Sequence, residues 1–101
     1  MTMEKNKITT TLWDASEHLE TDEDMVMYLE AALEDGDAGL ISAVLGDIAR
    51  AKGMTQIAKK AGLGRTSLYK ALSTDGQPEF DTILKVLKAM DLKLHVKSSK
   101  S

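Results

Sequence analysis

Five polar side chains within one short stretch have the donor groups and the spacing to bind nucleic acid. They are Arg65, Thr66, Ser67, Tyr69 and Lys70. The planar guanidinium of Arg65 can bind O6 and N7 of a guanine in the major groove. Thr66 and Ser67 can contact a base edge or a phosphate, whereas Tyr69 and Lys70 suit the sugar-phosphate backbone better. The same residue types also cover solvated helix faces, so the elements that carry them must decide between a functional and a structural interpretation.

The residues from 54 to 72 predict two short helices joined by a tight turn. Apolar positions in the first half share one helical face, and a Gly-Leu-Gly sequence then interrupts the pattern. In the second half, Leu68 and Leu72 form an i,i+4 apolar stripe. Gly62 can adopt the left-handed conformation that the turn needs. This pattern is typical of a helix-turn-helix whose outer face carries the five polar residues, but glycine turns also join helices in purely structural bundles.

Gln56 lies near the start of the first helix, which we expect to begin at residues 55–56. Its side chain can hold a phosphate with the helix amides behind it. Because one recognition helix binds weakly, we expect a homodimer on a palindromic operator in double-stranded DNA, with half-sites about 34 Å apart. The helix expected at residues 80–90 and the segment after it are candidates for the dimer surface, unless both merely complete the monomer core.

Three parts of the sequence resemble the Cro/CI (Xre) type of helix-turn-helix family. They are the segment from Gly62 to Tyr69, Ala58 four residues before it, and Pro78-x-Phe80-x-Thr82-Ile83-Leu84-Lys85-Val86-Leu87. The resemblance runs from about residue 37 to residue 94. It implies a lambda-repressor-like helical bundle. Two departures from the family pattern are Gly64, where many members have a serine cap, and Met54, where the usual base-contacting glutamine is expected. The second departure puts the role of Gln56 in doubt.

Shorter phrases throughout the chain resemble one branch of that family, the probable addiction module antidote proteins, which are similar to HigA antitoxins. The phrases are Trp13-Asp14-Ala15, Glu30-Ala31-Ala32-Leu33-Glu34-Asp35-Gly36-Asp37, Leu45-Gly46-Asp47-Ile48-Ala49-Arg50-Ala51, Ser67-Leu68-Tyr69-Lys70-Ala71-Leu72 and Leu92-Lys93-Leu94. This resemblance implies a bacterial antitoxin that pairs with a RelE/HigB-like ribonuclease toxin and regulates its own operon.

The charge of the chain is divided unevenly between its two halves. Residues 1–50 hold three basic and twelve acidic side chains, whereas residues 51–101 hold ten basic and four acidic ones. Such a division suggests two different partners. The acidic half fits a basic toxin, with Trp13 and Tyr28 as candidate contacts, although Trp13 also suits a core position. We therefore expect an acidic N-terminal extension (1–36), a DNA-binding core (37–97) and a short tail (98–101).

Caps and apolar periodicity predict an all-α fold with short terminal β-strands. Thr21 and Asp37 can start two helices that end at glycines, and a short helix is expected to begin at Asp14. Apolar positions then repeat at helical spacing in residues 80–90. After Asp91 the apolar residues alternate, which is typical of a strand, and residues 8–12 are its candidate partner.

Neither catalysis nor a metal site is expected. The chain has no cysteine, and His18 and His95 lie in unrelated segments without a neighbour at metal-ligand spacing. No nucleophile-base set or phosphate-binding loop is present. We expect a cytoplasmic protein without a cofactor, since no apolar run is long enough to span a membrane. Two other functions stay open: a stand-alone phage-type transcription regulator without a toxin, and an interaction module that does not bind DNA.

Overall fold

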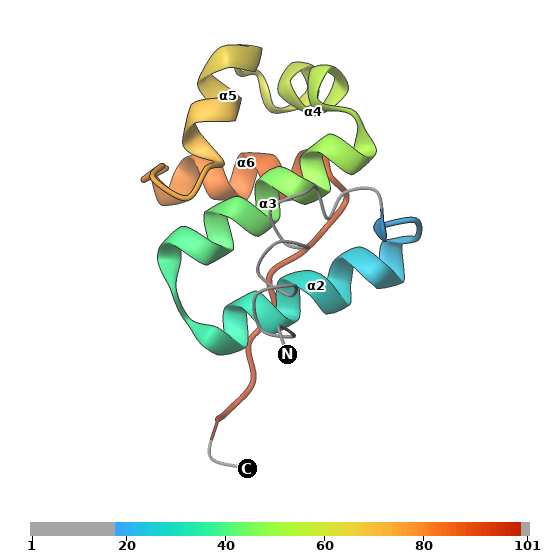
Figure 1. Cartoon of the computed structure of the whole chain (residues 1–101), viewed down its shortest axis with the longest axis vertical. Helices are drawn as coiled ribbons and strands as arrows, with labels where there is room; N and C mark the ends of the chain where they lie inside the picture. Colours follow the sequence, from blue (N-terminus) through green and yellow to red (C-terminus); the bar gives the residue numbers. More distant parts are fainter. Residues whose placement is uncertain (1–17, 100–101) are drawn as a thin grey trace, which may run out of the picture.

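The computed structural model describes residues 18–99, and every regular element in that part of the chain is an α-helix. The helices are α2 (Asp22–Asp35), α3 (Ala38–Lys52), α4 (Met54–Ala61), α5 (Arg65–Ala71) and α6 (Phe80–Ala89). Helices α2 and α3 pack together, α4 packs on α3 and α5, and α6 packs beneath α4 (Figure 1). The expected all-α class is therefore confirmed for the described residues. None of these helices is long and apolar enough to cross a membrane.

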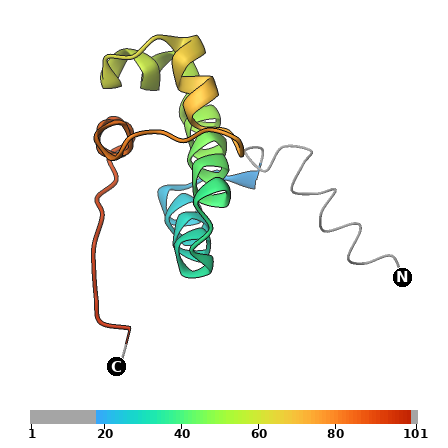
Figure 2. The same ribbon diagram turned by 90° about the vertical axis from the view of Figure 1, so that its left-hand side faces the viewer.

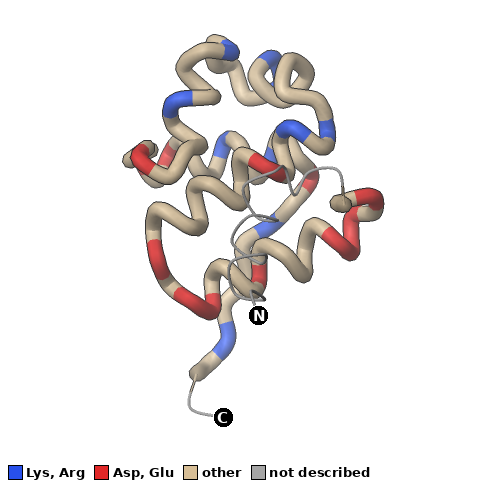
Figure 3. Tube along the Cα trace, viewed as in Figure 1, with Lys and Arg blue, Asp and Glu red and all other residues tan. Residues whose placement is uncertain are grey.

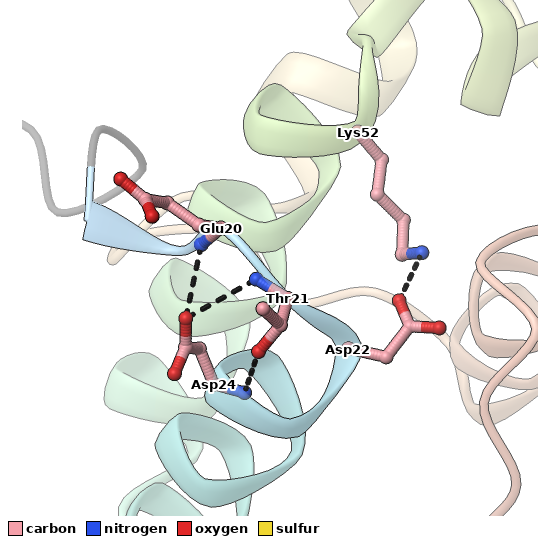
Figure 4. A network of polar contacts seen from close by, with 5 residues as sticks. All are labelled: Glu20, Thr21, Asp22, Asp24 and Lys52. Atoms are coloured by element: carbon pink, nitrogen blue, oxygen red, sulfur yellow. Dashed lines mark hydrogen bonds and ion pairs between the residues drawn. The ribbon is translucent and has the colours of Figure 1, made fainter.

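Helix α2 begins where a capping box and an ion pair fix the chain. The Thr21 hydroxyl accepts a hydrogen bond from the Asp24 amide at 3.0 Å, and the Asp24 carboxylate accepts from the Thr21 amide at 3.1 Å. The Nζ of Lys52 lies 3.0 Å from Oδ1 of Asp22, which links the end of α3 to the start of α2 (Figure 4). Reciprocal capping satisfies amides that the first helical turn leaves unpaired. The predicted threonine cap is confirmed.

Helix α3 is the central helix and lies in close contact with the end of α5. Asp37 caps it by accepting from the Leu40 amide at 2.8 Å, as its sequence position predicted. A Cβ added to Gly46 would lie 2.4 Å from the carbonyl oxygen of Leu72. The end of α5 therefore rests directly on the backbone of α3, which only glycine permits at this position.

The core lies between the five described helices, and α2 contributes three buried side chains to it. Its largest fully buried side chains are Leu45, Ile48, Leu68, Val86 and Met90. Three apolar positions of the helical stripes, Leu33, Phe80 and Leu84, are 43%, 65% and 43% exposed. Helices α2 and α6 each pack mainly on one neighbour, so the edges of their apolar stripes remain in solvent.

The expected C-terminal strand is absent from the described residues. After α6, Asp91 adopts a left-handed conformation with φ of 61°, and the Leu92 amide donates back to the Leu87 carbonyl at 2.9 Å. The chain then runs without regular structure along the outer edge of the molecule (Figure 2). A strand requires a hydrogen-bonded partner, and the described residues offer none. Residues 8–12 and the expected helix start at Asp14 lie outside the described residues.

Candidate nucleic-acid interface

The turn between α4 and α5 reverses the chain within three residues. Gly62 adopts the left-handed conformation with φ of 75°, and its amide donates to the Lys59 carbonyl at 3.2 Å. The Leu63 amide donates to the Ala58 carbonyl at 2.9 Å. These two bonds satisfy carbonyls at the end of α4 and hold α5 at a fixed angle to it. The predicted turn at Gly62 is confirmed.

Helix α5 is held from one side by two leucines. Leu68 is completely buried and Leu72 is 4% exposed, so both point into the core. The remaining face of α5 is in solvent, and it carries all the polar residues that the sequence singled out in this helix. The exposed residues are Arg65, Thr66, Ser67, Tyr69 and Lys70. The structure brings these five together on one surface. Gly64 precedes them without a side-chain cap.

Arg65 and Tyr69 interact with each other on this surface. The guanidinium carbon of Arg65 lies 5.5 Å from the centroid of the Tyr69 ring. Nη2 of Arg65 also lies 3.5 Å from the Tyr69 hydroxyl. A cation over an aromatic face is attracted by the ring quadrupole, which restricts the rotamers of both side chains. The i,i+4 spacing of an arginine and a tyrosine on a helix is the sequence signal for this pair.

Gln56 lies in the first turn of α4 and is exposed. Its amide oxygen lies 3.6 Å from the position that a Cβ on Gly53 would occupy, so the side chain folds back towards the N-terminus of the helix. Helix α4 begins at Met54, one residue earlier than expected, and Met54 is only 5% exposed. Met54, where the resemblance led us to expect a base-contacting glutamine, therefore belongs to the core. Thr55 and Gln56 are the first polar side chains of α4, and both are exposed.

Positive charge gathers on the same end of the molecule. Residues 53–74 contain four cationic side chains and no carboxylate, and all four are exposed. They are Lys59, Lys60, Arg65 and Lys70. Residues 18–49, by contrast, contain no Lys or Arg, and Figure 3 shows most of their Asp and Glu positions along α2 and at the start of α3. The electrostatic potential around α4 and α5 thus favours an anionic partner.

A partly buried polar network connects α2 to α3, and the sequence did not predict it. The Tyr28 hydroxyl donates to Oδ2 of Asp47 at 2.6 Å, and Arg50 pairs with Oδ1 of the same carboxylate. The Asp47 side chain is 13% exposed. Burial, the hydrogen bond to Asp47 and its negative charge raise the pKa of the Tyr28 phenol. The sequence signal was a single carboxylate, Asp47, inside the apolar stripe of α3.

The network limits which atoms of Tyr28 a partner protein can contact. Its hydroxyl is engaged within the chain and its ring is partly buried, so only part of the side chain is accessible. Tyr28 and Tyr69 instead line one groove of about 470 Å³ between the α2–α3 pair and α5. Trp13, the other candidate for a protein contact, lies outside the described residues.

A different part of α2 exposes apolar side chains beside carboxylates. Met27 is 68% exposed and Val26 is 38% exposed. Together with Asp22 and Glu23 they line a shallow hollow at the start of α2. An apolar centre with an anionic rim suits a protein partner that carries basic residues around an apolar contact. Within residues 18–99, no group of three or more His, Asp or Glu side chains converges on a metal-binding position.

Comparison with known proteins gives one family and one relative. A family model described as "Probable addiction module antidote protein" matches residues 9–98. A protein of Haemophilus influenzae, described as "Uncharacterized protein", is 47% identical over 88 residues, which cover 87% of this chain and 91% of the relative. No solved structure matches the chain.

Proposed function

Since the chain belongs to the family of probable addiction module antidote proteins, we propose that it is the DNA-binding antitoxin of a type II toxin-antitoxin module. It neutralises a RelE/HigB-like ribonuclease toxin and represses its own operon as a homodimer in the bacterial cytoplasm. One observation carries the proposal. The chain exposes a cationic α4–α5 surface without carboxylates and an acidic α2 without Lys or Arg, as two partners of opposite charge require.

The DNA-binding part of the proposal rests on the placement of α5. Two buried leucines anchor this helix on the core, and its five exposed polar residues face outward. In a lambda-repressor-like helix-turn-helix, such a helix enters the major groove. Arg65 then reads a guanine, Thr66 and Ser67 contact a base edge or phosphate, and Tyr69 and Lys70 hold the backbone. Gln56 and the N-terminal amides of α4 bind a phosphate beside them.

The toxin-binding part rests on α2 and the residues before it. Ribonuclease toxins bind RNA and therefore present a basic surface. The hollow around Met27, with Asp22 and Glu23 at its rim, offers an apolar contact and complementary charge. Tyr28, the next residue after Met27, fixes α2 on α3 through Asp47. We place the toxin contact on residues 1–36, including Trp13, and the operator contact on residues 37–97.

Two measurements test the proposal separately. For the operator, the protein is titrated against DNA from upstream of its own gene at several salt concentrations. Affinity is expected to fall steeply with ionic strength, because Lys and Arg displace counterions from phosphates. For the toxin, the neighbouring reading frame is expressed with and without this protein in a translation assay.

The outcomes distinguish the three functions. Protection together with salt-dependent binding supports the antitoxin. Salt-dependent binding without a toxin gene nearby indicates a stand-alone regulator. If the protein binds its partner but shows no salt-dependent affinity for DNA, the helix-turn-helix is only structural.

A further inference from the structure

Helix α6 and the segment that follows it share an exposed apolar face. Phe80 and Leu84 are 65% and 43% exposed on α6, and Leu94 and Val96 are 43% and 88% exposed after it. Leu84 and Leu94 line the same groove, of about 580 Å³, between the helix and the segment. We call these four residues the α6–tail face. Isolated exposed apolar residues are ordinary, but a groove lined by two of them, with Phe80 on the same helix and Val96 on the same segment, indicates a contact surface.

The backbone beside this face is also unpaired. Among the described residues, Lys93 to Lys97 make no backbone hydrogen bond to the rest of the chain. Their side chains alternate between apolar and polar types, as in a strand with one buried face. Figure 2 shows the segment at the outer edge of the molecule, beyond α6. An exposed run of this kind is a template for pairing with another strand.

We propose that a second copy of this chain occupies the α6–tail face through an antiparallel, two-fold pairing centred on Leu94. In this register Leu94 faces Leu94, and Leu92 faces Val96, so apolar side chains stay on one face. This register also brings Lys97 of the other copy towards Asp91, which lies in the left-handed turn just before the paired residues, so opposite charges meet at each end of the ribbon. A shift by two residues, centred on His95, would place Lys93 opposite Lys97 and is disfavoured by their like charges.

Self-pairing also accounts for the helix residues. A short two-stranded ribbon alone is marginally stable in water, so it needs an apolar face to pack on. Phe80 and Leu84 supply that face from both copies, since a two-fold interface uses the same patch twice. The inference deepens the proposed function. It rests on that function only where it explains what the dimer is for: a two-fold dimer presents two copies of α5 to a palindromic operator. The pairing itself is independent of DNA.

Cysteine cross-linking tests the register directly. The natural chain contains no cysteine. Directly opposite residues in an antiparallel pair have Cβ atoms about 4.5–5.5 Å apart, so Leu94→Cys is expected to form a disulfide between two copies under mild oxidation. Met27→Cys, at an exposed apolar position on α2, is the matched control and should stay monomeric on a non-reducing gel. Equal cross-linking of both variants, or of neither, overturns the proposed register.

The oligomeric state tests the surface. By light scattering, the unmodified chain should have twice the mass of one 11.0 kDa chain. Val96→Asp is expected to weaken the dimer by about tenfold or more, and Met27→Asp is expected to leave it unchanged. Both positions are highly exposed, so neither substitution disturbs folding. A monomeric parent chain, or a Val96→Asp variant as dimeric as the parent, rejects the surface.

DNA titration separates this inference from the proposed function. A monomeric Val96→Asp variant that still binds a single half-site supports both. If the parent dimerises through Leu94 but binds no DNA at any salt concentration, the dimer surface stands and the operator proposal fails.

Discussion

The guanidinium carbon of Arg65 lies 5.5 Å from the centroid of the Tyr69 ring, one helical turn further along α5. The contact restricts an otherwise flexible side chain before any partner arrives, which lowers the entropy lost on binding. Under the proposed function, Arg65 and Tyr69 therefore act together, with Tyr69 orienting the guanidinium and Arg65 contacting the base.

Replacing Arg65 by alanine should weaken binding to the operator by about 1–3 kcal/mol and relax discrimination at one base pair. The reason is the loss of a bidentate contact to a guanine. Fluorescence anisotropy with single-base operator variants measures both effects. Lys70→Ala is the control, since loss of a phosphate contact weakens all sequences equally. An Arg65→Ala variant with unchanged affinity and preference would exclude Arg65 as a base contact.

Tyr69→Leu should reduce discrimination at the base pair read by Arg65, whereas Tyr69→Phe should retain most of it. Phenylalanine keeps the aromatic face, which is worth about 0.5–1 kcal/mol at an exposed site, and removes only the hydroxyl 3.5 Å from Nη2. The comparison is made with the same operator variants. If both substitutions have the same effect, the hydroxyl or a direct phosphate contact matters and the ring does not.

Tyr28→Phe should destabilise the protein by about 1–2 kcal/mol at neutral pH, because the buried Asp47 carboxylate loses its hydrogen-bond donor. Urea unfolding with the parent chain measures the difference. Tyr69→Phe is the matched control, since it removes the same hydroxyl from an exposed ring. A Tyr28→Phe variant as stable as the parent would show that the network contributes nothing.

The parent chain and the Tyr28→Phe variant should respond differently to alkaline pH. The folded protein raises the pKa of Tyr28 above its ordinary value of about 10. Its stabilising effect is thus complete below about pH 10 and is lost as the pH rises through the higher folded value, because the unfolded tyrosine releases its proton first. Repeating the urea titrations above pH 10 should show the gap between parent and Tyr28→Phe becoming smaller. If the difference in stability between the parent chain and the Tyr28→Phe variant widens instead, the stabilising effect assigned to the Tyr28 hydroxyl is contradicted.

Gly46→Ala should cost about 1–3 kcal/mol and displace α5, since the new Cβ would lie 2.4 Å from the Leu72 carbonyl oxygen. Because a backbone atom blocks the space, no side-chain rotation relieves the clash. Gly64→Ala is the control: its Cβ would meet only Ser67 Oγ at 3.8 Å, and the cost should be about 0.5 kcal/mol from the weaker helix cap. Thermal unfolding compares the two. If the Gly46→Ala and Gly64→Ala variants were equally stable, α5 would be free to move away from α3.

Much of the helical fold was predictable because its signals are local. Caps at Thr21 and Asp37 lie within one turn of the amides they satisfy, and the break at Gly62 needs only one backbone conformation. The exposed polar face of α5 followed from the two leucines that anchor it.

The remaining features depend on contacts between distant parts of the chain. The Tyr28–Asp47 bond joins residues 19 positions apart, and apolar periodicity cannot show which edge of a stripe a neighbour covers. For Phe80 and Leu84 the sequence therefore left open whether α6 completes the core or forms a dimer surface, and both side chains are exposed. The same limit applies to residues 92–96, whose alternation indicates a strand only if another strand is available to pair with.

The arrangement of charge also gives the molecule an electric dipole, with its positive end at α4 and α5 and its negative end towards α2 (Figure 3). In the field of a polyanion such a particle experiences a torque as well as an attraction, and it turns its positive end forward before contact. Collisions that begin with the wrong orientation are thereby corrected in solution, and added salt removes this advantage by shortening the range of the field.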